Sequence, residues 1–387
     1  MRTPHDLTPL EAAVGIPFDA ADRAASCAAR RDASDPAAEL ERALLAPLGR
    51  EPCLVTFSGG RDSSAVLSAA VQAARKNGLP EPVAVTLRFR GRPAAEESQW
   101  QELVAKSLGL REWERVEVGD ELDFVGPLTT ERLRRFGPLY PANAAAVVPL
   151  AERARGGSLV VGQGGDELFG LWRRRRVADV LAGRARPRLR DPAAVGLAAA
   201  PLRLRRSVLR RRAVLDPALT WLTPAARAQL AELEADELAA EPARWSRYAQ
   251  ASVRRRDVTL AVRTLSALAA ELDAELHAPL LDPRFTAALA RAGGWTGFAD
   301  RTAAMSAAFN GALPPELLRR TDKATFTEVF WTSESRRFAE SWSGSGLDER
   351  IVDPEAVRRT WLAEAPDYRT GTLLQAAWLH DRGEAPV

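Results

Sequence analysis

The chain has 387 residues, of which 46% are hydrophobic and 27% are charged, so it can bury one large core or two ordinary ones. This composition excludes collagen-like, mucin-like and intrinsically disordered proteins. Its purely apolar runs are far shorter than the roughly 20 residues that cross a bilayer, and the N-terminus lacks the order of a signal peptide. We therefore expect a globular, cytoplasmic protein with no membrane partner.

The charge is uneven along the chain. The formal net charge is +3, yet residues 171–212 hold fourteen arginines against Asp179 and Asp191. Such a block suits an acidic peptide, RNA or an anionic surface, and it also suits a helical hairpin with a solvated arginine face. Because only three of the 54 basic residues are lysines, arginine clusters are weak signals in this chain. We favour the hairpin, leave an acidic peptide open and do not expect nucleic acid.

Two cysteines occur, Cys27 and Cys53, and without a secretory context we interpret both as reduced thiols. Cys53 opens an apolar run, so we expect it to be a small buried hydrophobe.

Periodicity divides the chain into an N-terminal extension (1–36), an α/β core (37–170) and a helical region (171–387) that completes the same catalytic unit. A first helix is expected over 36–48. Strands and helices then alternate, with strands predicted at 53–57, 82–89, 113–118 and 158–161 and helices at 63–76 and 96–108. This alternation predicts an α/β fold with a doubly wound parallel sheet and ligand sites at the carboxyl ends of the strands.

A glycine-rich loop, Ser58–Ser64, lies between the first predicted strand and the helix after it. Backbone N–H groups, small hydroxyls and the positive helix end converge there, as a phosphate requires. Gly59 and Gly60 let the main chain approach a phosphate, and Asp62 offers an oxygen ligand suited to Mg²⁺. The spacing is neither Walker A nor the dinucleotide fingerprint. The residues expected to bind phosphate are Ser58, Gly59, Gly60, Asp62, Ser63 and Ser64.

A second loop, Gly162–Gly170, reads Gly-Gln-Gly-Gly-Asp-Glu-Leu-Phe-Gly after a predicted strand. The first loop resembles the pyrophosphate loop of the ATP pyrophosphatases, with their adenine nucleotide alpha-hydrolase-like fold. The second resembles the acidic turn of the synthetase domain of asparagine synthetases. This resemblance implies that ATP is converted to AMP and pyrophosphate while a carboxylate is activated. It also implies that Asp62 and Asp166 together hold Mg²⁺.

Two further segments extend the resemblance over roughly residues 37–335. Glu275-Leu-His-Ala-Pro-Leu-Leu-Asp282 resembles the family's acidic, proline-containing segment near the substrate. Leu-Leu-Arg-Arg-Thr-Asp-Lys323 resembles its later basic segment, which implies that Lys323 stabilises the charge of the transition state. By family order, substrate roles are implied for Glu97, Gln163 and Glu275, and adenine contacts for Thr56, Leu87 and Gly162.

The sequence departs from asparagine synthetases in the parts that would supply the nitrogen donor and bind the substrate. It shows neither their N-terminal cysteine nucleophile nor a glutaminase domain, so we do not expect glutamine to be its nitrogen donor. Gln163 stands where the family has an acid, and Ala267 where it has a lysine. With these changes the chain is similar to the lasso-peptide macrolactam cyclases and β-lactam synthetases.

We therefore predict an ATP- and Mg²⁺-dependent ligase that adenylates a small-molecule or peptide carboxylate for attack by an amine or ammonia. A peptide macrolactam cyclase is one form of this hypothesis. The alternatives are a non-catalytic, peptide-binding partner protein and a thiolation or lysidine-type modification of nucleotides.

Overall fold

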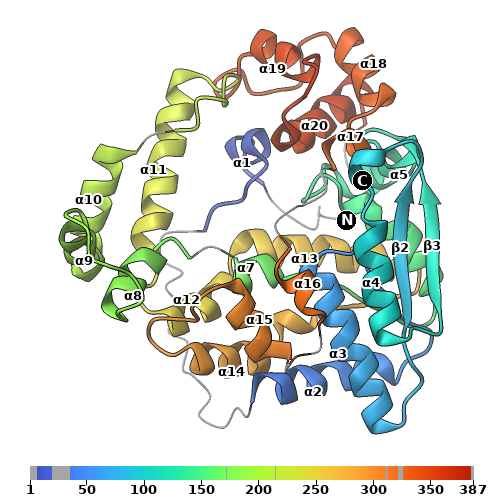
Figure 1. Cartoon of the computed structure of the whole chain (residues 1–387). Coiled ribbons are helices and arrows are strands. Elements are labelled where there is room, and N and C mark those ends of the chain that lie inside the picture. The colour runs from blue at the N-terminus through green and yellow to red at the C-terminus, as the bar shows by residue number, and fades with distance from the viewer. Residues whose placement is uncertain are drawn as a thin grey trace.

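The fold contains one sheet of parallel strands, two of which are labelled at the right-hand side of Figure 1. The computed structural model describes residues 7–19, 35–170, 172–213, 215–309, 311, 313–320 and 326–384. The strands are β1 (Cys53–Thr56), β2 (Val83–Phe89), β3 (Trp113–Val118), β4 (Ser158–Val160) and β5 (Glu275–His277). The predicted α/β class is confirmed, since every neighbouring pair of strands is parallel.

The strand order is β3-β2-β1-β4-β5. The chain runs outward from β1 through β2 to β3, and then returns to place β4 on the other side of β1. The direction of winding therefore reverses between β1 and β4. In open α/β sheets, ligands bind outside the carboxyl ends of the strands at this switch point.

Strand side chains alternate between two hydrophobic cores, as the pleat requires. In β1, Leu54 belongs to one core, whereas Cys53 and Val55 belong to the other. Both faces of the sheet are thus buried, which explains why its strands read as continuous apolar runs.

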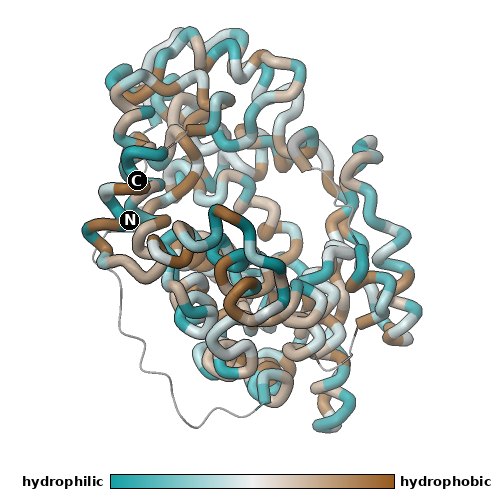
Figure 2. The backbone as a smooth tube through the Cα atoms, turned by 60° about the vertical axis from the view of Figure 1, so that its left-hand side comes forward, coloured by the Kyte–Doolittle hydropathy of each residue, from teal (hydrophilic) through white to brown (hydrophobic). Residues whose placement is uncertain are grey.

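Amphipathic helices supply the rest of both cores, and hydrophilic and hydrophobic stretches alternate along them (Figure 2). The core on the Val55 side includes residues of α2 (Pro36–Leu48), α3 (Arg61–Asn77), α4 (Ser98–Leu108), α7 (Gly165–Phe169), α8 (Arg175–Leu181), α12 (Trp245–Ser252), α14 (Pro283–Gly293), α15 (Arg301–Phe309) and α16 (Pro315–Leu318). The core on the Leu54 side includes residues of α1 (Pro9–Val14), α5 (Pro127–Phe136), α6 (Val148–Arg153), α11 (Pro224–Ala240), α13 (Arg256–Ala270), α17 (Thr327–Phe330), α18 (Ser333–Ser341), α19 (Pro354–Trp361) and α20 (Gly371–Asp381).

Helix α2 illustrates how the sequence specifies these elements. Leu40, Leu44 and Leu48 recur every fourth residue and are buried. The carboxylate of Asp35 accepts the N–H of Ala37 at 3.1 Å and so caps the helix at its predicted start. The observed bounds of α2 and β3 are the predicted ones, and the other predicted elements differ from the observed ones by a few residues.

One strand was not predicted. Residues 275–277 form β5 beside β4 and extend the sheet into the region that is predicted to be mainly helical. A strand of three residues is too short to show a period of two. Among the described residues, no helix is long and apolar enough to cross a membrane.

The arginine-rich block forms α8, α9 (Asp191–Ala199) and α10 (Leu202–Arg212), and α10 packs along α11 at one side of the molecule (Figure 1). Several of its arginines pair with acids of the same fold. Arg210 donates to both carboxylate oxygens of Asp236 at 2.9 and 2.7 Å, and Arg176 lies 2.8 Å from Asp191. These pairs agree with the predicted hairpin, and the structure offers no support for an acidic peptide at this surface.

The N-terminal and C-terminal segments meet in one core. Helix α1 packs against α20, and Trp221 donates its indole N–H to the carbonyl of Ala13 at 2.9 Å. The described part of the N-terminal extension thus belongs to the main body of the fold. The boundaries at residues 36 and 170 stay predictions.

Candidate active site

The predicted phosphate loop forms the turn between β1 and α3, at the switch point of the sheet. Gly60 is the N-cap of α3 and brings no side chain to this helix end, and its own N–H donates to the hydroxyl of Ser58 at 3.2 Å. The first N–H groups of α3 are therefore open to an acceptor, and the partial positive charge of the helix end favours an anion. This geometry suits a phosphate group.

Two serine hydroxyls fold the loop onto itself. The hydroxyls of Ser58 and Ser63 lie 3.0 Å apart, and each accepts a backbone N–H of the loop at 3.2 Å, from Gly60 and Ser58 respectively. A phosphate oxygen is a stronger acceptor than a hydroxyl and can replace these bonds. Ser64 differs from both, because its side chain is completely buried.

Glycines allow the second loop to touch the first. A Cβ on Gly165 would lie 2.3 Å from Cγ of Asp62, and one on Gly162 would lie 3.2 Å from the backbone of Ser63. Gly164 adopts a φ of 102°, a conformation that favours glycine. The Gly-Gln-Gly-Gly motif therefore brings the loop of Asp166 against the loop of Asp62.

Arg301, the first residue of α15, joins the two aspartates. Its Nη2 lies 2.7 Å from both carboxylate oxygens of Asp62, and its Nη1 lies 3.3 Å from Oδ1 of Asp166. Asp62 is only 19% exposed, whereas Asp166 is 68% exposed. The two carboxylates therefore face one position that is occupied by a positive charge and open to solvent on the Asp166 side.

Burial and neighbouring charges act in opposite directions on the pKa values of Asp62 and Arg301. Burial holds the pKa of Asp62 above its ordinary value, although the Arg301 guanidinium acts to lower it. Burial also acts against the charge on Arg301, yet the Asp62 carboxylate holds the pKa of Arg301 above its ordinary value. The cation beside the buried carboxylate thus favours its ionised form.

Glu97, predicted to contact substrate, lies beside the phosphate loop, and its substrate role stays a prediction. Its carboxylate is buried and paired with Arg320, whose Nη1 donates to Oε2 of Glu97 at 3.1 Å and to the carbonyl of Gly59 at 3.0 Å. Nearby, Nε2 of Gln101 donates to the carbonyl of Ser58 at 2.9 Å. Glu97 therefore acts on the loop through Arg320 and is a positioning residue.

The residues predicted to contact adenine lie together at the carboxyl edge of the sheet. Thr56 ends β1, Leu87 lies on β2 beyond the end of β1, and Gly162 follows β4, so the three share the carboxyl edge of the sheet. Gln163 lies half-buried in the second loop.

One predicted residue, Glu275, is not brought to this edge, and another, Lys323, cannot be placed relative to it. Glu275 begins β5 at the amino edge of the sheet, where it lies 2.5 Å from Arg50, so the structure does not bring it to the two loops. The direction of β5 explains the difference, because the first residue of a parallel strand lies opposite the ligand edge. Lys323 lies outside the described residues.

The whole-chain comparison agrees with the two loops. A family model described as asparagine synthase matches residues 38–380, which is most of the chain. The chain belongs to the asparagine synthase family. A search of the curated proteins finds no match. Asparagine synthase members form amides with ATP, so the family supports an ATP-dependent ligase that joins carbon to nitrogen.

The two aspartates fit a Mg²⁺ ion of the kind that asparagine synthase members use with ATP. Among the described residues, no group of three or more His, Cys, Asp or Glu side chains is arranged to hold a metal. In nucleotide sites Mg²⁺ is bound by one or two carboxylates together with substrate phosphates, so two ligands are sufficient. Asp62 and Asp166 would hold such an ion.

Sequence reasoning missed three residues of this asparagine synthase site, namely Arg301, Arg320 and Gln101. Each contacts the loops from a distant part of the chain, Arg301 from 239 positions beyond Asp62. The available signal was weak, because arginine is the ordinary basic residue of this chain.

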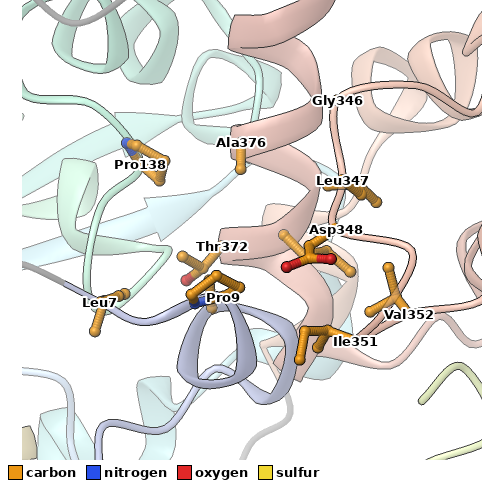
Figure 3. A pocket seen from close by; sticks show the side chains of 12 residues that line it. Leu7, Pro9, Pro138, Gly346, Leu347, Asp348, Ile351, Val352, Thr372 and Ala376 are labelled. Carbon is orange, nitrogen blue, oxygen red and sulfur yellow. The ribbon is translucent and has the colours of Figure 1, made fainter. Parts of the chain in front are cut away.

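A separate pocket of about 390 Å³ lies away from the two loops (Figure 3). It is bordered by the start of α1, the 346–352 segment and α20. Leu347 and Ile351 line it with Asp348, and its surface is mainly apolar. No residue of the candidate active site takes part in it.

Proposed function

We propose that the chain is an ATP- and Mg²⁺-dependent ligase that adenylates a carboxylate and transfers the acyl group to a nitrogen. One observation supports this most directly. Asp62 and Asp166 come from two loops at the switch point of the sheet and face one cation position beside a phosphate loop. This is the arrangement that a nucleotide with a departing pyrophosphate needs.

The reaction has two steps. An oxygen of the substrate carboxylate attacks the α-phosphorus of ATP, the bond from that phosphorus to the bridging oxygen breaks, and pyrophosphate leaves. The nitrogen nucleophile then attacks the acyl carbon, loses a proton, and AMP departs with the electrons of the carbon–oxygen bond. Holding both substrates in one site supplies much of the rate.

The described residues act mainly on the pyrophosphate. The N–H groups at the start of α3 and the hydroxyls of Ser58 and Ser63 donate hydrogen bonds to its oxygens. Asp62 and Asp166 would hold Mg²⁺, which would supply positive charge against the same oxygens. Lys323 is the proposed donor toward the α-phosphate and the acyl oxygen.

The acceptor side supports an amine of a larger molecule as the nucleophile. Gln163 is neutral where asparagine synthetases carry an acid, and Ala267 on α13 packs against the hydrophobic core, where a lysine is expected. These changes remove two charged side chains that would recognise free aspartate and ammonia. They favour a peptide carboxylate and a peptide amine, as in a macrolactam cyclase, as the form of the reaction.

The alternatives have less support. A non-catalytic partner protein has no need of two carboxylates on one cation position, and the pair is intact. A thiolation reaction needs an accessible thiolate, and the one cysteine within the described residues, Cys53, is buried, with its pKa raised by burial to about 12; Cys27 lies outside those residues.

The test is pyrophosphate release from ATP with Mg²⁺ and two substrate sets. One set is aspartate with ammonia, and the other is a linear peptide with a free N-terminal amine and a side-chain carboxylate. Asp62→Asn and Asp166→Asn are each expected to reduce release to background, because each removes a formal charge from the site at constant size. Circular dichroism is expected to show intact folds.

Asp236→Asn is the matched control, because it breaks an arginine–aspartate pair of similar length outside the loops and should release pyrophosphate like the parent. Parent-like release by either loop variant would show that the two-loop metal site is wrong. No release from a folded parent with either substrate set would instead favour the non-catalytic partner.

A further inference from the structure

Arg301 stands where the proposed function requires a divalent cation. Its two terminal nitrogens reach Asp62 and Asp166 together, at 2.7 and 3.3 Å. The side chains of Arg301 and Asp62 are only 22% and 19% exposed, so their charges are poorly screened by water. One guanidinium charge thus partly neutralises two carboxylates.

A metal and this guanidinium cannot use the position at the same time. Nη2 is equally close to both oxygens of Asp62, so it closes the face of the carboxylate between them. Mg²⁺ approaches its oxygen ligands to about 2.0–2.1 Å and keeps a near-octahedral shell, which needs that space. Two cations a few ångströms apart would also repel each other in a site with little water.

Helix α15, which carries Arg301, is held by packing against a neighbouring helix. The guanidinium of Arg301 has one N–H group without a hydrogen-bond partner in the described part of the chain. Helix α15 packs onto α7, the helix of Asp166, where the rings of Phe309 and Phe169 lie 5.7 Å apart and are tilted by 53° to each other. Among the described residues, the buried Nε of Arg301 has no hydrogen-bond partner. A rotation about the side-chain bonds of Arg301 would therefore vacate the position without moving α15.

We propose that Arg301 is an internal counter-cation of Asp62 and Asp166 that the incoming Mg²⁺ displaces, so that the two cations compete for the same carboxylates. This inference rests on the metal role given to both aspartates in the proposed function. It explains how one guanidinium accommodates two acids that lie close together. Once displaced, the planar guanidinium is beside the phosphate loop, where its fork matches phosphate oxygens.

The experiment measures binding of Mn²⁺ alone to the full chain without nucleotide, by electron paramagnetic resonance of the free ion. Arg301→Met is expected to bind Mn²⁺ at least tenfold more tightly than the parent, because the competing charge is gone. Arg301→Lys, which keeps the charge but loses the fork, is expected to lie between them. Arg284→Met, on the exposed surface of α14, is the control and should bind like the parent.

Thermal unfolding gives a second readout. In EDTA, Arg301→Met is expected to melt below the parent, because two neighbouring carboxylates have lost their counter-charge. Added Mg²⁺ should then raise its melting temperature by more than it raises that of the parent. A purely structural arginine would lower the melting temperature without this gain from the metal.

The Asp62→Asn variant distinguishes failure of the counter-cation role of Arg301 from failure of the metal site. If Asp62→Asn abolishes Mn²⁺ binding but neither Arg301 variant binds Mn²⁺ more tightly than the parent, the counter-cation role is wrong and the metal site stands. If Asp62→Asn leaves Mn²⁺ binding unchanged, the metal site of the proposed function is itself wrong. Tighter binding by Arg301→Met together with loss in Asp62→Asn supports the competition.

Discussion

Asp62 occupies the space that a side chain on residue 165 would fill. The ideal Cβ of that residue would lie 2.3 Å from Cγ of Asp62, a distance that carbon atoms do not tolerate. The glycine therefore sets how closely the two acidic loops approach, and with it the separation of Asp62 and Asp166.

Gly165→Ala is expected to separate the loops and lower the rate of pyrophosphate release by roughly tenfold or more, which corresponds to about 1.4 kcal/mol in the barrier. The φ of Gly165 is not positive, so the methyl group, rather than backbone strain, is responsible. Gly196→Ala in α9 is the matched control, because no atom lies within 4 Å of its Cβ position. Equal rates for both variants would mean that loop separation does not limit the reaction.

Removal of Arg320 tests the support of the phosphate loop. Arg320→Met leaves the buried carboxylate of Glu97 without this counter-charge, and such losses cost about 3–5 kcal/mol of unfolding free energy. The double variant Glu97→Gln/Arg320→Met should recover part of this stability in urea titrations. Its pyrophosphate release should stay low, because the carbonyl of Gly59 has still lost its donor.

Arg210→Met provides the comparison for Arg320→Met. Arg210 makes a partly exposed pair with Asp236, and such surface pairs contribute little to stability because water screens their charges. If both methionine variants lost equally little stability, the pair of Glu97 and Arg320 would have no special structural role.

The elements that could be predicted from the sequence are those with a local signal. Each core strand combines an apolar run with a glycine turn, and the acidic motif around Asp166 is contiguous. The pairing of Asp62 with Asp166 came from family resemblance, and the structure brings both to Arg301.

What sequence reasoning could not find depends on contacts between distant segments. Arg301 lies 239 positions from Asp62 and 135 from Asp166, and Arg320 lies 261 positions from Gly59. Glu97 and Glu275 were both predicted as substrate residues from their order in the family. Burial against Arg320 and the direction of β5 place the two at different parts of the fold, and neither feature has a local pattern.

The thiol of Cys53 gives a test of the core that does not depend on catalysis. This residue is 6% exposed at the start of β1, and burial raises its pKa to about 12. At pH 8 iodoacetamide should therefore leave the Cys53 peptide unlabelled in the folded protein and label it after denaturation in urea, as mass spectrometry would detect. Rapid labelling of this peptide in the native protein would contradict its burial in the core beside α2 and α3.

Lys323 is the proposed source of positive charge at the reacting phosphorus. It follows Arg320, which holds the phosphate loop, by three positions in the sequence. Its partner charge is largest as the pentavalent phosphorus and then the tetrahedral carbon form, so Lys323→Ala should lose rate far more than affinity for ATP. The expected loss is about 3–4 kcal/mol, on the order of 10² to 10³ in rate, as for other preorganised donors. Lys323→Arg should recover little of the rate, because a planar fork does not replace a compact ammonium.

The measurement for Lys323 is single-turnover adenylate formation at saturating ATP, with Lys106→Ala on the exposed side of α4 as the control. A rate for Lys323→Ala equal to that of the control would make Lys323 an ordinary surface lysine.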